Sequence, residues 1–418
     1  MKRTLCAAVF SFFAAASVFS LEKPFFSGTT GFLTDINNRE KIFGAQSYFA
    51  GQFDFSGKLF LRGEFYVQAT DLFNKNIFDP GTSEKNASFR IEELSATYKV
   101  NGKKAIHYLT VFNGNYEPMG SDLFLQRQFG IAPIHSFLTE SYHGIEGSSF
   151  YDFYSTGAAY TAHTSNNNVF GISLYKNKAK QDNDFNYNAA NMDFRYATIL
   201  PNITVDLLAG ISLPIEDKDE DADDNLMTVR EIQMHGGINA LFGRKNEIQC
   251  LFGFGIDKLL LKKGRSKDGS VKLEDLYFII EPRIPVSEVT VSTSFFNIPS
   301  SSAKNMIYMK PILRKNPATE SILGLNLNIV DESVIIGTTK FTFGAQGTLG
   351  IANLTFDSLK DNVHDAIKDC NTTFLITPYT NIEIYGGTLY GYVSADLTAI
   401  TDSKYPSLYG GFGFRTNF

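Results

Sequence analysis

The last residues of the sequence are Ser407-Leu408-Tyr409-Gly410-Gly411-Phe412-Gly413-Phe414-Arg415-Thr416-Asn417-Phe418. Alternate residues from Leu408 to Phe418 are apolar, glycine or threonine, and the residues between them carry most of the polar groups. Successive side chains of a β-strand point to opposite faces, so this period predicts one apolar and one polar face. A tilted strand needs about 9–11 residues to cross a bilayer, and the stretch is long enough. We therefore expect a membrane-crossing strand here.

The terminal Phe418, with aromatic residues at alternate positions before it, resembles the closing strand of outer-membrane β-barrel proteins. In that family the last residue is an assembly signal. The resemblance implies an outer-membrane location, with membrane lipid and the barrel-assembly machinery as partners. It also gives Phe418 the role of assembly signal.

The amino terminus has the pattern of a secretory signal peptide. Lys2 and Arg3 precede an apolar run over residues 5–19, and Ser17 and Ser20 provide small residues near a cleavage point. The run is short for a membrane-spanning helix, although an uncleaved anchor is the alternative. We expect a signal peptide over residues 1–20 and one barrel domain over residues 21–418.

Composition supports a barrel and excludes a bundle of membrane helices. Mean hydropathy is −0.11, and residues 21–418 contain no long apolar segment. A barrel escapes hydropathy analysis because every second residue faces lipid. Aromatic residues make up 14% of the chain although tryptophan is absent, so Phe and Tyr would form the interfacial girdles. The net charge of −6 argues against a nucleic-acid partner.

The same alternation recurs along the chain. In one example Ile203, Val205 and Leu207 alternate with Thr204 and Asp206. At roughly 20–22 residues per strand and connection, the length predicts an all-β, antiparallel up-and-down barrel of about 18 strands, within a range of 16–20. The alternation slips between Ile91 and Leu94, which predicts a β-bulge.

Full charges lie on the predicted polar faces, where a water-filled lumen would accept them. The candidates for lining a pore are Asp54, Lys58, Arg62, Glu64, Asp193, Arg195, Asp206, Glu231, Glu281 and Arg283. The structural alternative is that paired charges brace the wall or plug the lumen.

Short and long connections alternate, as they do between the periplasmic and external sides of outer-membrane barrels. The predicted turns include Ser56-Gly57, Asn101–Lys103, Pro201-Asn202, Gly243–Asn246, Pro285–Ser287 and Asp331–Ser333. The predicted loops are Asp71–Asn86, Tyr116–Ser149, Asn177–Asn186, Glu216–Asn225, Lys262–Lys272, Pro299–Glu320 and Asp357–Asn371.

The loop Tyr116–Ser149 follows the fifth expected strand and is rich in apolar residues. It resembles, in position and length, the porin loop that folds into the channel as a constriction, although the charged motif of that loop is not matched. The candidates for a constriction are Glu117, Asp122, Arg127 and His135. The sequence supports equally well a loop that packs over the mouth of the barrel or onto a neighbouring subunit.

Other sequence features give weaker predictions. The acidic run Glu216–Asp224 could bind Ca²⁺, but it lacks the spaced ligands and turn glycine of a dedicated site, so a solvated loop is favoured. Helical spacing over Asp357–Asp369 predicts a short helix in an outer loop. Cys250 and Cys370 permit one disulfide. We expect no cofactor or metal, and the six histidines match no catalytic motif.

The favoured function is therefore a porin-like channel for passive diffusion of small hydrophilic solutes, weakly cation-preferring, and a homo-oligomer remains open. The alternatives are a transporter for hydrophobic substrates, resembling the fatty-acid barrels, and a surface adhesin. An enzyme is the least favoured class.

Overall fold

The computed structural model describes residues 25–73, 87–131, 134–141, 150, 154–180, 186–216, 228–229, 232–262, 271–352, 354, 371–384, 386–399 and 407–418. The expected signal peptide over residues 1–20 and the expected helix over Asp357–Asp369 lie outside these residues.

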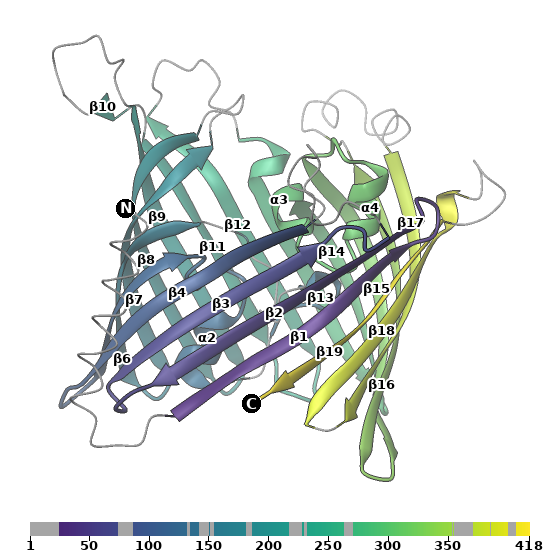
Figure 1. The fold of residues 1–418 in the computed structure, drawn as a ribbon, viewed down its shortest axis with the longest axis horizontal. Helices are drawn as coiled ribbons and strands as arrows, with labels where there is room; N and C mark the ends of the chain where they lie inside the picture. The colour runs from purple at the N-terminus through teal and green to yellow at the C-terminus, as the bar shows by residue number, and fades with distance from the viewer. Residues whose placement is uncertain are drawn as a thin grey trace.

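The described chain is a closed antiparallel β-barrel of 18 strands (Figure 1). Its strands in chain order are β1 (Phe25–Asn37), β2 (Ile42–Asp54), β3 (Leu59–Ala69), β4 (Ala87–Asn101), β5 (Ile106–Gly114), β6 (Ser155–Ser165), β7 (Asn168–Lys180), β8 (Asn186–Leu200), β9 (Ile203–Glu216), β10 (Thr228–Val229), β11 (Ile232–Phe242), β12 (Gln249–Lys262), β13 (Leu276–Val286), β14 (Val289–Pro299), β15 (Ser321–Ile336), β16 (Thr339–Ala352), β17 (Asn371–Ile384), β18 (Gly387–Asp396) and β19 (Ser407–Asn417). The two-residue β10 and the long β11 both pair with β9, so together they hold one position. The predicted fold class and strand number are confirmed.

Closure comes from pairing between the first and last strands. β1 lies antiparallel to β19, with Thr29 opposite Asn417 and Asn37 opposite Tyr409. The backbone amide of Phe418 donates to the Gly28 carbonyl at 2.9 Å, and the Gly28 amide donates back at 3.0 Å. A closed barrel satisfies the backbone groups that an open sheet edge would leave unpaired in lipid.

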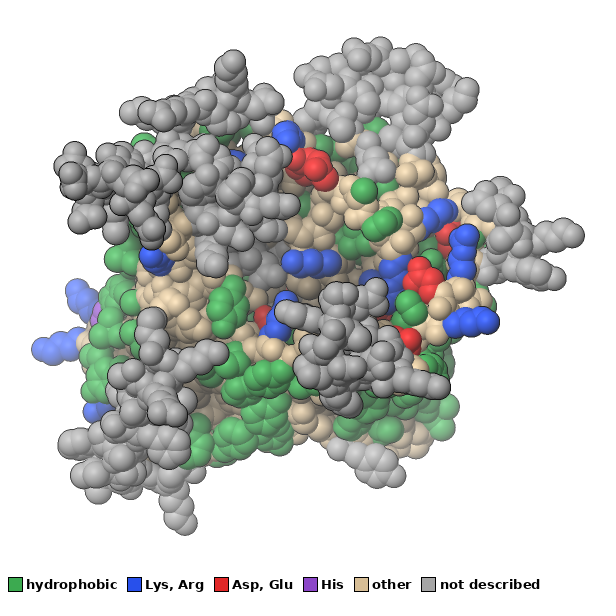
Figure 2. All heavy atoms as spheres, turned by 45° about the horizontal axis from the view of Figure 1, so that its top comes forward, with side chains coloured by type: hydrophobic (Ala, Val, Ile, Leu, Met, Phe, Trp, Pro, Cys, Tyr) green, Lys and Arg blue, Asp and Glu red, His purple; other side chains and the backbone are tan. Residues whose placement is uncertain are grey.

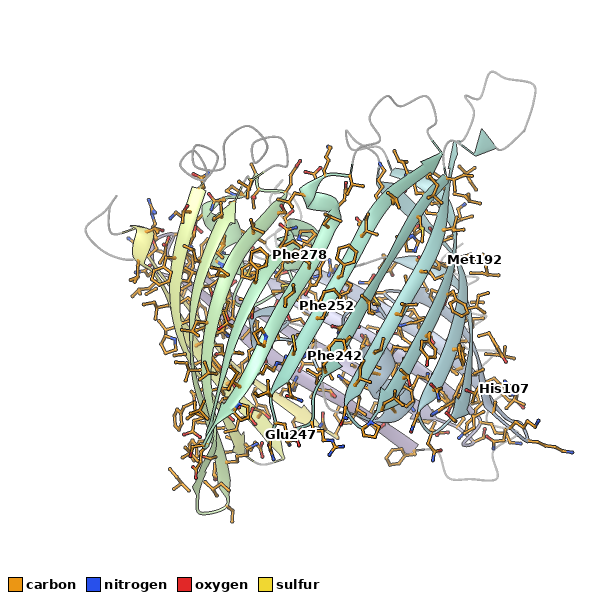
Figure 3. All side chains as sticks on the ribbon, turned by 180° about the vertical axis from the view of Figure 1, so that it is seen from behind. His107, Met192, Phe242, Glu247, Phe252 and Phe278 are labelled. Carbon is orange, nitrogen blue, oxygen red and sulfur yellow. The ribbon has the colours of Figure 1, made fainter. Side chains whose placement is uncertain are left out.

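The two faces of the wall follow the predicted alternation. On β19, Leu408 and Phe412 are exposed outward at 39% and 47%, whereas Tyr409 is 7% exposed and points inward. On β15, Leu325 faces outward and Asn326 inward. Seen from behind, Phe278, Phe252 and Phe242 lie in descending order along the outer wall, and Glu247 lies near a turn (Figure 3).

The connections are segregated by length. With two exceptions, the short links between β1 and β2 and between β7 and β8, the connections at the upper end of Figure 1 are the long loops, and the hairpin turns lie at the lower end. The link between β7 and β8 is shorter than the predicted loop Asn177–Asn186, because β7 continues to Lys180. The predicted segregation is confirmed. We call these two ends the loop end and the turn end.

Two local predictions have opposite outcomes. The bulge on β4 is confirmed, because Glu64 pairs with Glu93 and Phe65 with Ile91, so the register skips Glu92. The turn predicted at Asp331–Ser333 is wrong. β15 continues to Ile336 through a register shift, and Asp331 Oδ1 accepts hydrogen bonds from the backbone amide and hydroxyl of Ser333. These polar groups satisfy one another within a bulge, and the chain reverses later, after Gly337 at φ +66°.

Helices are minor elements. α2 covers Leu123–Phe129, α3 covers Ser300–Ala303 and α4 covers Lys310–Lys315. Within the described residues, no helix is both long and apolar enough to cross a membrane.

Candidate functional site

Two loop-end segments fold into the barrel and join across its lumen. The first comprises residues 115–131 and 134–141 of the β5–β6 connection, and the second comprises residues 300–320 between β14 and β15. Ser141 and Met306 form an antiparallel bridge, and the Ile307 amide donates to the Glu140 carbonyl at 2.9 Å. We call the joined segments the lumen arch. The described part of the predicted constriction loop therefore lies inside the barrel.

The first segment turns inward because its apolar residues require burial. α2 buries Leu123, Phe124 and Leu125 and ends at Gly130, whose φ of +65° suits glycine. Asp122 accepts hydrogen bonds from the Ile134 amide at 3.0 Å and the His135 amide at 3.1 Å. These bonds fold the segment back on itself and position both predicted residues, Asp122 and His135, which also pair through the His135 ring at 2.9 Å.

Arg127 fixes the arch to β3 and β4. Its Nη2 lies 2.8 Å from Glu93 and 3.2 Å from Glu64, and its Nη1 lies 3.5 Å from Glu117. Burial raises the pKa of Glu117, and the neighbouring Arg127 opposes that shift. Three carboxylates therefore meet one guanidinium in a site nearly closed to water.

A second attachment joins the arch to β8 and β9. Arg195 binds Asp206 through Nε at 2.8 Å and Nη2 at 2.5 Å, and its Nη1 donates to the Glu117 carbonyl. Beside it, Asp193 accepts from Tyr175 at 2.9 Å and lies 2.8 Å from His235.

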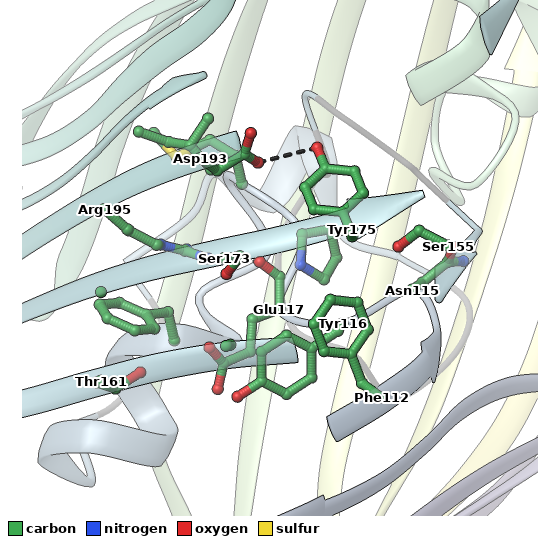
Figure 4. Close-up of a pocket in the computed structure, with 16 residues that line it drawn as sticks. Phe112, Asn115, Tyr116, Glu117, Ser155, Thr161, Ser173, Tyr175, Asp193 and Arg195 are labelled. Carbon is green, nitrogen blue, oxygen red and sulfur yellow. Dashed lines mark hydrogen bonds between the residues drawn. The ribbon is translucent and has the colours of Figure 1, made fainter. Parts of the chain in front are cut away.

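A cavity of about 50 Å³ lies beside these groups and is lined by the wall residues Asp193 and Arg195 and by residues 115–119 of the arch (Figure 4). The Phe112 and Tyr116 rings stack along its edge, with centroids 4.5 Å apart. Tyr175 points across it to Asp193, with the hydrogen bond drawn as a dashed line. The cavity accommodates one or two waters but no larger solute.

β13 holds the middle of the arch. Arg283 donates to the carbonyls of Ile134 at 3.1 Å and His135 at 2.7 Å, and pairs with Glu281 at 2.8 Å. The Ser136 hydroxyl also donates to Glu281. Two pore candidates therefore bind the arch itself.

The second segment is fixed beside the barrel seam. Asp35 on β1 accepts hydrogen bonds from Arg314 at 2.5 and 2.9 Å and from Lys310. Lys315 lies 3.2 Å from Asp396 at the loop end of β18. Seen with the loop end turned forward, basic and acidic side chains gather at the mouth and apolar side chains cover the outer wall (Figure 2).

An apolar core lies inside the barrel, between the arch and the loop-end parts of β13 and β14. The inward residues Tyr277, Ile279, Phe296 and Ile298 pack with residues of the arch. The arch contributes Met119, Leu138, Met306, Met309 and Ile312 to this core. The sequence signal was the unbroken apolar run Leu276–Ile280, which is typical of a strand buried on both faces.

The middle of the inner wall from β14 to β18 carries uncharged hydrogen-bonding groups. Its buried polar residues are Ser292, Ser294, Asn326, Asn328, Gln346, Thr348, Thr377 and Ser394. Asn326 donates to Thr348 at 2.8 Å, and Thr377 and Ser394 lie 2.7 Å apart.

The sequence-predicted residues separate into three groups. Arg62, Glu64, Asp193, Arg195, Asp206, Glu281 and Arg283 lie on the inner wall, and Glu117, Asp122, Arg127 and His135 lie in the arch. The mid-strand placement is wrong for Asp54 and Lys58. Asp54 ends β2 and accepts from the Gly57 amide at 2.8 Å, and Lys58 lies in the exposed turn, because the carboxylate organises the turn locally.

Glu231, the acidic residues 217–224 and Cys370 lie outside the described residues, and Cys250 is a free thiol. Sequence reasoning missed several charged partners: Asp35, Glu93, Lys310, Arg314 and Asp396. Across the described ranges there is no group of three or more His, Cys, Asp and Glu side chains suited to a metal ion.

No protein-family model matches the chain, and no curated protein matches its sequence. Among solved structures, OccAB3 of Acinetobacter baumannii matches with a TM-score of 0.51 and 10% identity, covering 95% of this chain and 99% of that one. A multiply substituted porin of Rh. blastica matches with a TM-score of 0.41 and 12% identity, covering 95% of this chain and all of that one. The likeness to OccAB3 shows a shared porin-type barrel fold.

Proposed function

We propose that this protein is an outer-membrane channel for passive diffusion of small hydrophilic solutes, and that the lumen arch is its constriction. The observation that supports the proposal is the attachment of the arch to the polar inner wall at β3, β4, β8 and β13 of a closed barrel. An arch held inside the lumen sets the size of what passes, and the surrounding dipoles and charges replace the hydration of a solute.

The proposal also includes the expectations about export, assembly, lipid contact and oligomeric state. A signal peptide over residues 1–20 would deliver the chain for export, and the barrel-assembly machinery would read Phe418. Lipid would contact the apolar outer wall, and a homo-oligomer stays a prediction. The channel carries out no chemical step.

We expect a weak cation preference. Glu64, Glu93 and Glu117 outnumber their cationic neighbours Arg62 and Arg127 by one, and Lys310 and Arg314 outnumber Asp35 by one. The two local imbalances oppose each other, so the net field is small. It should fade with salt, because the Debye length falls from about 30 Å at 0.01 M to about 3 Å at 1 M.

Planar-bilayer recording on the refolded protein tests the proposal. We expect discrete channels. Their reversal potential in a KCl gradient should indicate a slight selectivity for cations at low salt and should lie close to zero at high salt. Liposome swelling with neutral solutes of rising size gives the exclusion limit. Absence of conductance, or a clear anion preference, would contradict this function and favour the hydrophobic-substrate transporter or the adhesin.

A further inference from the structure

Three lysines gather on two neighbouring turns at the turn end of the barrel. Lys58 lies in the β2–β3 turn, Lys103 and Lys104 lie in the β4–β5 turn, and all three are exposed. β3 pairs with β4, and the Lys99 amide donates to the Lys58 carbonyl at 2.6 Å, so the two turns lie side by side. We call Lys58, Lys103 and Lys104 the lysine turn cluster.

The lysine turn cluster lacks acidic partners. Among the residues that the structure describes, none of its three ammonium groups forms an ion pair or a hydrogen bond. The acidic residue nearest to it along the chain is Asp54, whose carboxylate accepts hydrogen bonds from the Ser56 and Gly57 amides at 3.2 and 2.8 Å. That carboxylate is used to organise its own turn, so the positive charge of the cluster remains available to a ligand.

Another part of the turn end has the opposite charge. The turns and strand ends from β13 to β18 expose Glu288, Glu332 and Glu383, and Lys340 lies 3.6 Å from Glu383. The whole chain has a net charge of −6. The lysine turn cluster is therefore a local concentration of positive charge and not a general property of this end of the barrel.

The outer wall next to the cluster carries aromatic and apolar side chains. Tyr98 and Val100 on β4 are exposed outward, and the His107 Nδ1 lies 2.8 Å from the Tyr160 hydroxyl, with the two rings stacked 5.9 Å apart. His107 lies at the turn end of the wall, and a Cβ added at Gly102 would lie 2.9 Å from its Nε2, so the ring packs against the β4–β5 turn (Figure 3). Rings with one polar edge are typical of the boundary between lipid and water.

This arrangement places the three ammonium groups at the level of lipid headgroups. The lipid-facing wall ends at the aromatic side chains, and the lysines follow within a few residues. A lysine stem can lie along apolar surface while its ammonium reaches a phosphate, and clustered basic residues beside a membrane attract anionic lipid.

We propose that the lysine turn cluster binds the phosphate headgroup of an anionic phospholipid in the membrane leaflet at the turn end, with the acyl chains lying against Tyr98 and Val100. A lipid supplies both the anion that the ammonium groups lack and the chains that cover the apolar wall beside them. The inference rests on the membrane location in the proposed function, and it names the lipid that the wall selects.

Native mass spectrometry of the detergent-purified protein tests the site, with phosphatidylglycerol and phosphatidylcholine of identical chains as the two probes. Each lysine near a membrane surface should contribute roughly fivefold in affinity for an anionic lipid. We expect phosphatidylglycerol to bind the wild type about tenfold more tightly or better. A variant with Lys58→Gln, Lys103→Gln and Lys104→Gln should lose this preference, whereas arginine at the same three positions should keep it because the charge is retained.

The matched control removes three lysines from the turn end outside the cluster: Lys99→Gln, Lys245→Gln and Lys340→Gln. Lys99 shares the inward face of β4 with the buried Thr97, Lys245 lies in the β11–β12 turn, and Lys340 lies on β16. This variant has the same net charge as the glutamine variant of the cluster and should keep the preference for phosphatidylglycerol. Equal losses in the two variants would overturn the site.

Other results would also overturn the proposal. Equal affinity of the wild type for the two lipids would contradict recognition of the headgroup charge. Displacement of phosphatidylglycerol by inorganic phosphate at matched ionic strength would assign the cluster to a free anion. Pairs of barrels that form in the wild type and are lost in the glutamine variant would assign it to the acidic turns of a second copy.

Planar-bilayer recording separates this inference from the proposed channel. Conductance without any lipid preference would overturn the lipid site and leave the channel intact. A lipid preference without conductance would support the lipid site and overturn the channel.

Discussion

The inner wall has two sectors that hold the arch in different ways. The charged sector, on β3, β4, β8, β9, β11 and β13, carries ion pairs such as those of Arg127 and Arg195. The neutral sector, in the middle of β14–β18, carries amides, hydroxyls and tyrosines. A buried charge that loses its partner costs several kcal/mol, whereas a lost neutral hydrogen bond costs about 1 kcal/mol. The arch is therefore fixed strongly by one sector and contacted mainly through packing at the other.

The seam between β1 and β19 lies next to the neutral sector. Disrupting the pairing at this seam should have the largest effect on the amount of folded barrel. Deleting Phe418 removes two backbone hydrogen bonds with Gly28 and ring contacts with Phe26 and Phe49, whose centroids lie 5.2 and 5.5 Å away. If Phe418 is also the assembly signal, barrel should be lost from the outer membrane while precursor collects in the periplasm. Quantifying both fractions checks this, and unchanged membrane levels would oppose both roles.

Arg127→Met tests the charged sector directly. The change leaves Glu64, Glu93 and Glu117 facing one another in a buried site, and should lower the free energy of unfolding by about 3–5 kcal/mol. Urea unfolding in lipid vesicles measures it. The matched control is Arg90→Met, since the Arg90 side chain is 54% exposed and its pair with Glu92 should contribute about 0–1 kcal/mol. Equal losses in the two variants would remove the distinction between the sectors.

Leu325→Arg tests the outer face that backs the neutral sector. Leu325 is exposed outward near the middle of β15, so arginine should cost about 2–4 kcal/mol in lipid. Thr342→Arg, on the inward face near the turn end of β16 and opposite the neutral Asn381, should be nearly neutral and serves as the control. Asp206 and Asn326 are unsuitable controls despite facing inward, because both are buried. The same urea titration applies, and equal costs for the two variants would contradict the assignment of faces.

Thr377→Val should have the smallest effect. It removes the 2.7 Å hydrogen bond with Ser394 and should cost about 0.5–1.5 kcal/mol. Dividing the loss in free energy of unfolding for Arg127→Met by that for Thr377→Val compares one interaction from each sector. A loss as large as that of Arg127→Met would contradict the difference in strength between the interactions of the two sectors.

Much of the wall follows from local sequence. Period-2 alternation predicts the faces of Leu207 and Asp206, and the slip near Ile91 predicts the bulge at Glu92. The lengths of the connections distinguish the loop end of the barrel from the turn end. The apolar content of Tyr116–Ser149 favours a loop with a buried surface.

The partners inside the lumen depend on contacts that local patterns do not encode. Arg127 meets a carboxylate 63 positions away, and Arg314 meets Asp35 across 279 positions. Polar residues near turns are also ambiguous, because a carboxylate can organise a turn, as Asp54 does, or a bulge, as Asp331 does. A pattern of alternating residues assigns a face but not the group that meets it.

Single-channel conductance before and after shortening the arch tests whether the arch is the constriction of the channel. Residues 120–149 are replaced by a short glycine-serine linker, and the refolded barrel is recorded in the same salt as the wild type. If the arch is the constriction, conductance rises and larger neutral solutes pass. An unchanged conductance in a correctly folded barrel would contradict the claim and place the resistance elsewhere.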